Sequence, residues 1–375
     1  MKRFFAWCKS EIVLCIAFVL ALVSSCFVLP DKAYVTYIDF RTLAILFCLM
    51  VVMAGFQKVG LFQWIAEKLL QKIKNIRGIV FLLIALCFFS SMLITNDVAL
   101  ITFIPFAFIV LRMVLKENAE KMIVPVVVMQ TIAANLGSML TPIGNPQNLY
   151  LYGKSGVNFL EFLWLMFPYT IVSLVLLSVW CLMFPYKGEK KIRIELEQKT
   201  NVSNVKKELI VYTGLFVICV LTVAHVIPYM ITLAIVILAI LFLDRKVFAD
   251  VDYALLFTFV GFFVFIGNIG RIPAFNSLLQ SVIKGNEILT SIVSSQFMSN
   301  VPTALLLSGF TKEYELLIIG TNLGGLGTLI ASMASLISFK YIGKEYRQLK
   351  GKYLIYFTVA NLMFLLILFG MVLVL

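Results

Sequence analysis

The chain has very few charged residues and almost no histidine. Only 13% of its 375 residues are Asp, Glu, Lys or Arg, and His occurs once. By contrast, 62% of the residues are hydrophobic, and the mean hydropathy is +1.02. Soluble globular domains carry about 25% charged residues. This composition therefore excludes a soluble domain and indicates an integral membrane protein.

Sequence motifs for enzymatic chemistry are also missing. The sequence contains no GxSxG nucleophile motif, no HExxH metal motif, no CxxC pair and no Walker A phosphate loop. Its seven cysteines are scattered singly in or beside apolar segments, which is typical of core residues. We therefore predict a protein that is not an enzyme, needs no cofactor and does not use ATP as its energy source.

Apolar runs long enough to cross a bilayer recur along the whole chain. We predict crossings at 11–29, 41–57, 122–151, 161–183, 209–227, 229–243, 253–269, 313–339 and 353–375. Two further apolar stretches, 78–115 and 287–310, carry a polar break in the middle. That pattern is typical of a helical hairpin that enters and leaves the membrane on one side, with its polar tip buried in protein.

The distribution of Lys and Arg predicts the orientation in the membrane. If the N-terminus is cytoplasmic, only a few of the 31 Lys and Arg residues lie outside, namely Lys32, Arg41, Lys154, Arg271, Lys284 and Lys312. This excess of cations inside follows the positive-inside rule and explains the net charge of +12 as topology. The bilayer, and not a nucleic acid, is then the partner. A basic stretch at 56–78 has one apolar face, which predicts a helix along the inner leaflet.

In this orientation the first hairpin opens from the cytoplasm and the second from outside. We therefore predict an all-α polytopic membrane protein with two inverted-topology repeats, each containing a re-entrant helical hairpin and a broken transmembrane helix (122–151 and 313–339). The expected boundaries are 1–186 for the N-terminal repeat, 187–208 for a cytoplasmic linker and 209–375 for the C-terminal repeat.

One polar phrase occurs in both halves. NLGSMLTPIGNPQN (135–148) and NLGGLGTLIASMAS (322–335) lie inside predicted crossings, and the hairpin tips read SSMLITND (90–97) and SSQFMSNV (294–301). Gly and Pro interrupt helices in mid-membrane. A broken helix directs its partly positive N-terminus at an anion, while free carbonyl and Asn or Thr oxygens hold sodium. One such motif favours close helix packing, but four in repeated order indicate a binding site.

The polar residues of these four motifs are the candidate site. They are Thr95, Asn96, Asp97, Thr141, Gly144, Asn145, Ser299, Asn300, Thr328 and Ser332. We predict that Asn96 and Asn300 bind the ion or substrate and that the others line the interrupted segments. Asp97 is the only acid between 79 and 115, so we predict that its carboxylate carries a proton or binds sodium. The alternative role for Asp97 is a helix cap.

With these motifs the chain resembles the ion-transporter superfamily, which includes divalent-anion sodium symporters, citrate-type carriers, arsenite-efflux permeases and sodium/proton antiporters. The segments TND (95–97), TPIGNPQN (141–148), SNVPTALLL (299–307) and NLGGLGTLIASMAS (322–335) are most similar to the arsenite-permease and small citrate-transporter-like branch. The resemblance implies two inverted repeats. It also implies a homodimeric scaffold against which the transport domains move.

We therefore expect a secondary active transporter, or permease, of the cytoplasmic membrane. Its substrate would be a small anion, either dicarboxylate or citrate-like, or an inorganic oxyanion such as arsenite, and a Na+ or H+ gradient would drive alternating access. A sodium ion would bind near Asn96, Asp97 and Asn300. The alternatives are a Na+/H+ antiporter of the same fold, in which Asp97 carries the proton, and a membrane scaffold or sensor without turnover.

Overall fold

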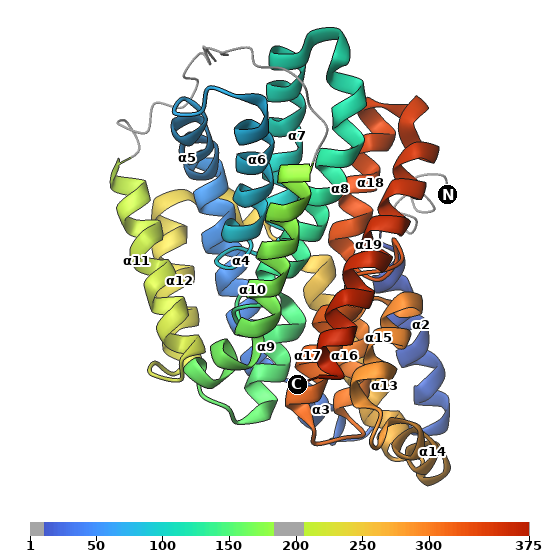
Figure 1. The fold of residues 1–375 in the computed structure, drawn as a ribbon. Coiled ribbons are helices and arrows are strands. Elements are labelled where there is room, and N and C mark those ends of the chain that lie inside the picture. Colours follow the sequence, from blue (N-terminus) through green and yellow to red (C-terminus); the bar gives the residue numbers. More distant parts are fainter. Residues whose placement is uncertain (1–10, 184–205, 375) are drawn as a thin grey trace, which may run out of the picture.

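The computed structural model describes residues 11–183 and 206–374, and in these residues the chain forms eighteen α-helices and no β-strand. The predicted linker, 187–208, lies outside the described residues except for its last three positions. Figure 1 shows the helices arranged as one elongated bundle, with α11 and α12 on one side and α2, α13 and α14 on the other.

Within residues 11–183, the described part of the N-terminal half contains nine α-helices. They are α2 (Ile12–Phe27), α3 (Tyr34–Tyr37), α4 (Phe40–Lys58), α5 (Leu61–Leu70), α6 (Ile76–Ser90), α7 (Asn96–Leu115), α8 (Ala119–Ser138), α9 (Pro146–Ser155) and α10 (Phe159–Met183). The basic stretch 56–78, predicted as one helix, is divided between the end of α4, the whole of α5 and the start of α6, because Gly60 adopts a left-handed conformation.

The described part of the C-terminal half contains nine helices as well. They are α11 (Lys206–Val223), α12 (Tyr229–Asp244), α13 (Tyr253–Gly270), α14 (Pro273–Ile283), α15 (Glu287–Met298), α16 (Asn300–Ser308), α17 (Tyr314–Gly324), α18 (Met333–Glu345) and α19 (Lys350–Val372). Among these helices only α14 lies where the sequence predicted neither a crossing nor a hairpin.

Length and composition allow several helices to cross a membrane. In the described ranges six helices are long and apolar enough: α4, α7, α8, α10, α13 and the C-terminal segment Arg347–Val372. Most residues of α8 are buried inside the protein, whereas the C-terminal segment has most of its surface exposed. An exposed surface of Leu, Ile, Val and Phe is stable only in a hydrocarbon environment. The fold is therefore that of a polytopic membrane protein.

Two pairs of helices are joined by very short connections. We call α6, the tip 91–95 and α7 the first hairpin, and α15, the tip Ser299 and α16 the second hairpin. Each hairpin packs on the first helix of an interrupted pair, the first hairpin on α8 and the second on α17. The second helix of each pair packs on the opposite half: α9 on α16 and α17, and α18 on α7 and α8. The interruptions fall at 139–145 and 325–332, inside the two crossings in which the sequence predicted broken helices.

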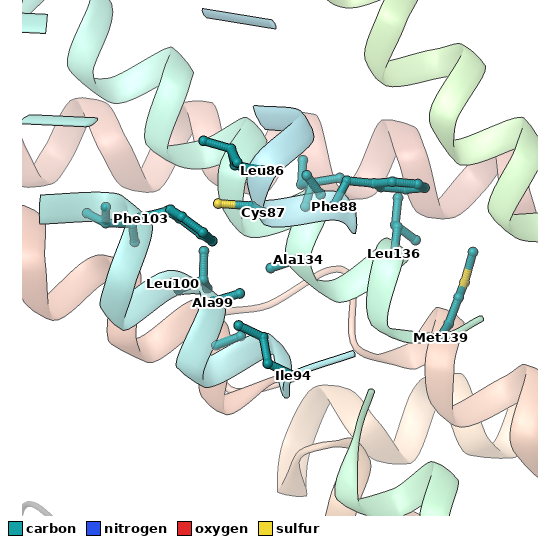
Figure 2. Close-up of a cluster of buried hydrophobic side chains, with 14 of the residues drawn as sticks. Leu86, Cys87, Phe88, Ile94, Ala99, Leu100, Phe103, Ala134, Leu136 and Met139 are labelled. Carbon is teal, nitrogen blue, oxygen red and sulfur yellow. The ribbon is translucent and has the colours of Figure 1, made fainter. Parts of the chain in front are cut away.

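The first hairpin packs on α8 through small and large apolar side chains. Figure 2 shows Leu86, Cys87 and Phe88 from α6, Ile94 from the tip, Ala99, Leu100 and Phe103 from α7, and Ala134 and Leu136 from α8 around one buried cluster. Ala99 and Ala134 are fully buried, and their small side chains let the helix backbones approach closely. This packing fixes the depth of the tip relative to the interruption after α8.

Glycine is required where each interrupted pair meets its hairpin. A Cβ atom on Gly137 of α8 would lie 2.0 Å from the carbonyl oxygen of Phe88 on α6. In the second half, a Cβ atom on Gly324 of α17 would lie 2.6 Å from the Ser295 hydroxyl on α15. Both distances are shorter than any ordinary contact, so both hairpins approach their partner helix at a glycine.

We predict that Gly137→Ala destabilises the protein. The backbone carbonyl of Phe88 cannot rotate away as a side chain can, and overpacking of this kind costs about 1–3 kcal/mol. The thermal unfolding temperature of the purified full chain in detergent is expected to fall. Gly370→Ala is the control, because nothing lies within 4 Å of a Cβ atom at Gly370 in α19. An unchanged unfolding temperature for Gly137→Ala would contradict the close approach.

Candidate functional site

The first hairpin tip is bonded directly to the interruption between α8 and α9. The Asn96 backbone N–H, at the start of α7, donates to the carbonyl oxygen of Gly144 at 3.3 Å. The Thr141 hydroxyl donates to the carbonyl oxygen of Met92 at 2.5 Å. These two bonds use groups that the interrupted helices leave without helical partners.

The second half repeats both bonds at equivalent positions. The Asn300 backbone N–H, at the start of α16, donates to the carbonyl oxygen of Ala331 at 2.9 Å. The Thr328 hydroxyl donates to the carbonyl oxygen of Gln296 at 3.0 Å. In the repeated phrases Ala331 corresponds to Gly144 and Thr328 to Thr141. The sequence repeat is thus matched by a repeat of hydrogen bonds.

A buried carboxamide or hydroxyl from each interruption contacts the opposite half. The Asn145 side-chain amide donates to the Asn322 side-chain oxygen at 3.4 Å, and the Ser332 hydroxyl donates to the Asn135 side-chain oxygen at 3.0 Å. Asn145 and Ser332 are equivalent positions of the two phrases, as are Asn135 and Asn322. The two interruptions therefore meet through a reciprocal pair of contacts.

Two further side chains satisfy the carbonyl groups of the interruptions. Asn148, which is fully buried, directs its amide at the carbonyl oxygens of Ser138, Met139 and Thr141, at 3.3, 3.5 and 3.2 Å. Gln296 directs its amide at the carbonyl oxygens of Gly324 and Leu326, at 3.1 and 3.0 Å, and accepts from the Thr328 N–H. Carboxamides suit this task because each offers donors and an acceptor without a charge.

Four helix N-termini meet at one small cavity of about 10 Å³, which is roughly the space of one water molecule. The lining residues come from the first turns of α7, α9, α16 and α18 and from one residue of α13. They are Asn96, Asp97, Pro146, Gln147, Leu255, Asn300, Val301, Ser332 and Met333. Each N-terminus carries a partial positive charge from its unpaired N–H groups. Among the described residues no Lys, Arg or His lines this cavity, so the helix N-termini are its sources of positive charge, next to the carboxylate of Asp97.

Three buried polar atoms near the cavity have no hydrogen-bond partner among the described residues. They are the Asp97 Oδ1, Asn145 Oδ1 and Gln147 Nε2 atoms. Native proteins rarely leave buried polar atoms unpaired unless a ligand or ion completes them. Two free oxygens can coordinate a cation and one free amide can donate to an anion. The chemistry of the unpaired atoms thus fits an ion and a polar substrate at the same place.

Two larger cavities flank the small one. A cavity of about 160 Å³ is lined by Thr95 and Asp97 of the first hairpin, together with Asp250 and Asp252 before α13. A cavity of about 60 Å³ is lined by Ser299 and Val301 of the second hairpin, and also by Asp252. All three cavities share Leu255 of α13. Each hairpin tip therefore has a larger hollow beside it, and α13 separates them.

The second tip has an unusual backbone. Ser299 has φ 75° and ψ 154°, a region that residues with a side chain rarely adopt, whereas Thr95 at the first tip has an ordinary extended conformation. Such a conformation costs about 1–3 kcal/mol and persists only where the surroundings impose it, often at a ligand site. The two tips are therefore equivalent in position and different in backbone.

The structure places most of the sequence-predicted residues around this centre. Asn96, Asp97, Asn300 and Ser332 line the small cavity, while Thr95 and Ser299 line the larger ones. Thr141, Gly144 and Asn145 are buried in the first interruption. Thr328 is exposed on the far side of the second interruption, bonded to Gln296.

Sequence reasoning missed several residues of this region, among them Gln147, Asn148, Gln296 and Leu255. The signal for the first two was present, because both carboxamides follow the helix-initiating pair Asn145-Pro146. Leu255 had no signal, since an apolar residue in an apolar helix looks like any other core position.

The fold, the apolar helices and the buried polar centre define a polytopic membrane transporter, and comparison with known proteins agrees. The model of the citrate transporter family matches residues 4–315, so the chain belongs to that family and is not an enzyme. It is 35% identical over 335 residues to an uncharacterized transporter of Methanocaldococcus jannaschii, with 88% of each chain covered. It is 31% identical over 317 residues to the inner membrane protein YbiR of Escherichia coli, with 82% of each covered.

A more distant relative has a named substrate. The silicon efflux transporter LSI3 of rice is 32% identical over 133 residues, which cover 36% of this chain and 26% of that protein. The similarity to transporters thus extends from archaea to plants.

We predict that Asn148→Leu destabilises the first interruption. Leucine has a similar size but no donor, so the carbonyl groups of Ser138, Met139 and Thr141 lose the two N–H donors that they share. Leaving a buried acceptor unpaired costs about 1–3 kcal/mol. The unfolding temperature in detergent is expected to fall by more than that of Leu149→Met, a neighbouring buried substitution of nearly equal volume. Equal unfolding temperatures for the two variants would show that Asn148 does not stabilise the interruption.

Proposed function

We propose that the protein is a secondary active transporter for a small anion, driven by a Na+ or H+ gradient across the cytoplasmic membrane. The observation that carries this proposal is the meeting of four helix N-termini at a cavity without a cationic side chain. Helix N-termini bind anions through their free N–H groups and partial positive charge. A carrier can bind and release an anion more readily at such a site than at a buried Lys or Arg.

The architecture proposed for this function is a pair of inverted repeats, 1–186 and 209–375, joined by a cytoplasmic linker. The paired bonds of Asn96 with Gly144 and Asn300 with Ala331 support the repeat, and the distribution of Lys and Arg supports the inversion and a cytoplasmic N-terminus. Both hairpins would be re-entrant. Alternating access would expose the small cavity first through one of the flanking cavities and then through the other.

The substrate class proposed is dicarboxylate, citrate-like or inorganic oxyanion such as arsenite. The family description names citrate, and the rice relative is a silicon efflux transporter. The resemblance to the ion-transporter superfamily also supports a homodimer.

The coupling ion is proposed to act at Asp97. Its Oδ1 atom is buried and has no partner, and it is the only charged side chain that lines the small cavity. Sodium would bind near Asn96, Asp97 and Asn300, where carboxylate and amide oxygens are available. If the coupling ion is instead H+, Asp97 is the group that takes it up.

A second candidate is a Na+/H+ antiporter of the same fold. The observation in its favour is that Asp97 is acidic while its equivalent in the second half, Val301, is apolar. A single carboxylate that alternates between Na+ and H+ would suffice for such an exchange. The third alternative, a scaffold or sensor, would bind without turnover.

We expect gradient-driven uptake of one anion into proteoliposomes supplied with succinate, citrate, sulfate, phosphate or arsenite. Asn96→Ala and Asn300→Ala are expected to reduce uptake more than tenfold, because each removes a polar group from the cavity. Asp97→Asn is expected to leave substrate binding unchanged and to abolish the dependence of uptake on the Na+ or H+ gradient. Labelled substrate measures the uptake, and a pH-sensitive dye inside the vesicles measures the movement of protons.

Asn118→Ala serves as the matched control, since Asn118 is exposed in the turn between α7 and α8. It should transport at the wild-type rate. If protons move when Na+ is added without any anion, the protein is a Na+/H+ antiporter and not an anion transporter. If the substrate binds but no flux is seen, the protein is a scaffold or sensor.

A further inference from the structure

An apolar groove of about 300 Å³ lies between α5 and the first hairpin, and at Leu93 of the tip it adjoins the cavity of about 160 Å³. Its lining residues come from α5, α6, the tip and α7. They are Phe62, Ile65, Leu69, Leu82, Ala85, Leu86, Phe89, Ser90, Leu93 and Phe103. The single polar side chain, Ser90, donates its hydroxyl to the carbonyl oxygen of Leu86. No lining side chain is therefore left to hold water.

The groove is open to the surface of the protein. Leu69, Phe89 and Leu93 are 39%, 51% and 55% exposed. An enclosed apolar cavity of about 150 Å³ already stays dry and takes up hydrocarbon ligands. An apolar groove twice as large, on a protein that lies in a bilayer, therefore favours a hydrocarbon chain as its occupant.

Four cations follow the groove-lining part of α5 in the chain, at the end of α5, in the turn and at the start of α6. Lys68, Lys72, Lys74 and Arg77 are exposed, and none forms an ion pair with a described residue. Lys68 precedes the groove residue Leu69, and the other three lie in the turn to α6 and in its first turn. The N-terminus of α6 adds partial positive charge in the same part of the chain.

Acidic groups do not neutralise this cluster within the described residues. Glu67 is the nearest acid in the chain, but it is buried and accepts a hydrogen bond from Gln63. Lys58, at the other end of α5, is already paired with Asp244. The four cations are thus available to an anionic group from outside the described chain.

The second half provides an internal comparison. Helix α14 follows α13 and precedes the second hairpin, as α5 follows α4 and precedes the first, and it is as amphipathic as α5. Its apolar residues Phe275, Leu278 and Val282 are also exposed. Between 272 and 286, however, the only cation is Lys284. The amphipathic helix recurs without the cation cluster, which agrees with the predicted orientation, in which α5 faces the cytoplasm and α14 the outside.

We propose that this groove binds an anionic phospholipid, with one acyl chain along the apolar lining and the phosphate held by Lys68 and Lys72. Lys74 and Arg77 add to the attraction. Clusters of Lys and Arg at an amphipathic helix select anionic lipids because each cation near the surface contributes about 1 kcal/mol. The proposal does not depend on what the central cavity transports.

Trp64 on α5 allows a direct test in a bilayer. In a variant that keeps only this tryptophan (Trp7, Trp164 and Trp180 replaced by Phe), brominated lipids quench its fluorescence when they bind nearby. We expect brominated phosphatidylglycerol to bind at least fivefold more strongly than brominated phosphatidylcholine, with a preference that weakens at high salt. Lys68→Gln with Lys72→Gln is expected to reduce the preference at least fivefold, since about 1 kcal/mol per cation is about a factor of five.

Two variants separate the parts of the site. Lys284→Gln on α14 removes an equally exposed lysine and should leave the preference unchanged. Ala85→Phe fills the groove and should reduce quenching by both lipids. As a measurement on the unaltered chain, native mass spectrometry should find phosphatidylglycerol retained in preference to phosphatidylcholine.

The proposal would be overturned if the single-tryptophan variant with Lys68 and Lys72 intact bound the two lipids equally. It would also be overturned if the preference for phosphatidylglycerol survived the substitution of Lys68 and Lys72. It would also be overturned if Ala85→Phe dissociated an oligomer in light scattering, because a second copy of the chain would then be the occupant of the groove.

Discussion

The structure depends on one constraint: a helix interrupted inside a membrane must find partners for its backbone N–H and carbonyl groups, since no water is there to bind them. The chain meets this constraint at the same two places in each half. Each hairpin tip is hydrogen-bonded to the interruption beside it. In each half one carboxamide, Asn148 or Gln296, donates hydrogen bonds to carbonyl groups of the interruption that have no helical partner. The interruptions would otherwise be too costly to bury.

The same constraint shapes the electrostatics of the centre. Four helix N-termini converge on the small cavity, and the partial positive charge that they bring comes from backbone N–H groups, next to the carboxylate of Asp97. A buried Lys would hold an anion strongly and would need a counter-charge when empty. Helix ends and neutral amides avoid that cost, because partial charges are spread over many groups. A site that must be filled and emptied in each cycle benefits from this weaker attraction.

The sequence predicted the interruptions better than it predicted their contacts. Gly, Pro and Asn in the repeated phrases predicted breaks within 122–151 and 313–339, because these residue types interrupt helices locally. The observed interruptions, 139–145 and 325–332, lie inside the phrases 135–148 and 322–335. The pairs Asn145 with Asn322 and Ser332 with Asn135 could not be predicted, since they join segments from opposite halves of the chain. Thr328 illustrates the limit: its position in the phrase matches Thr141, but its side chain is exposed. The repeat fixes which residues lie in an interruption and not which way each side chain faces.

The two halves share the repeated backbone but differ in some of its side chains. One of these differences is a charge, because a carboxylate occurs in the first half only. Where the first half has Asp97, Gln147 and Asn148, the equivalent positions of the second half are Val301, Ala334 and Ser335. The bonds that hold the tips are common to both halves, so they serve the architecture. The unpaired Asp97 and Gln147 atoms occur only in the first half, so an ion that needs a carboxylate has one place to bind. In the proposed transport cycle, a symmetric framework with a single carboxylate would let the two halves exchange conformations while the coupling ion stays with the first half.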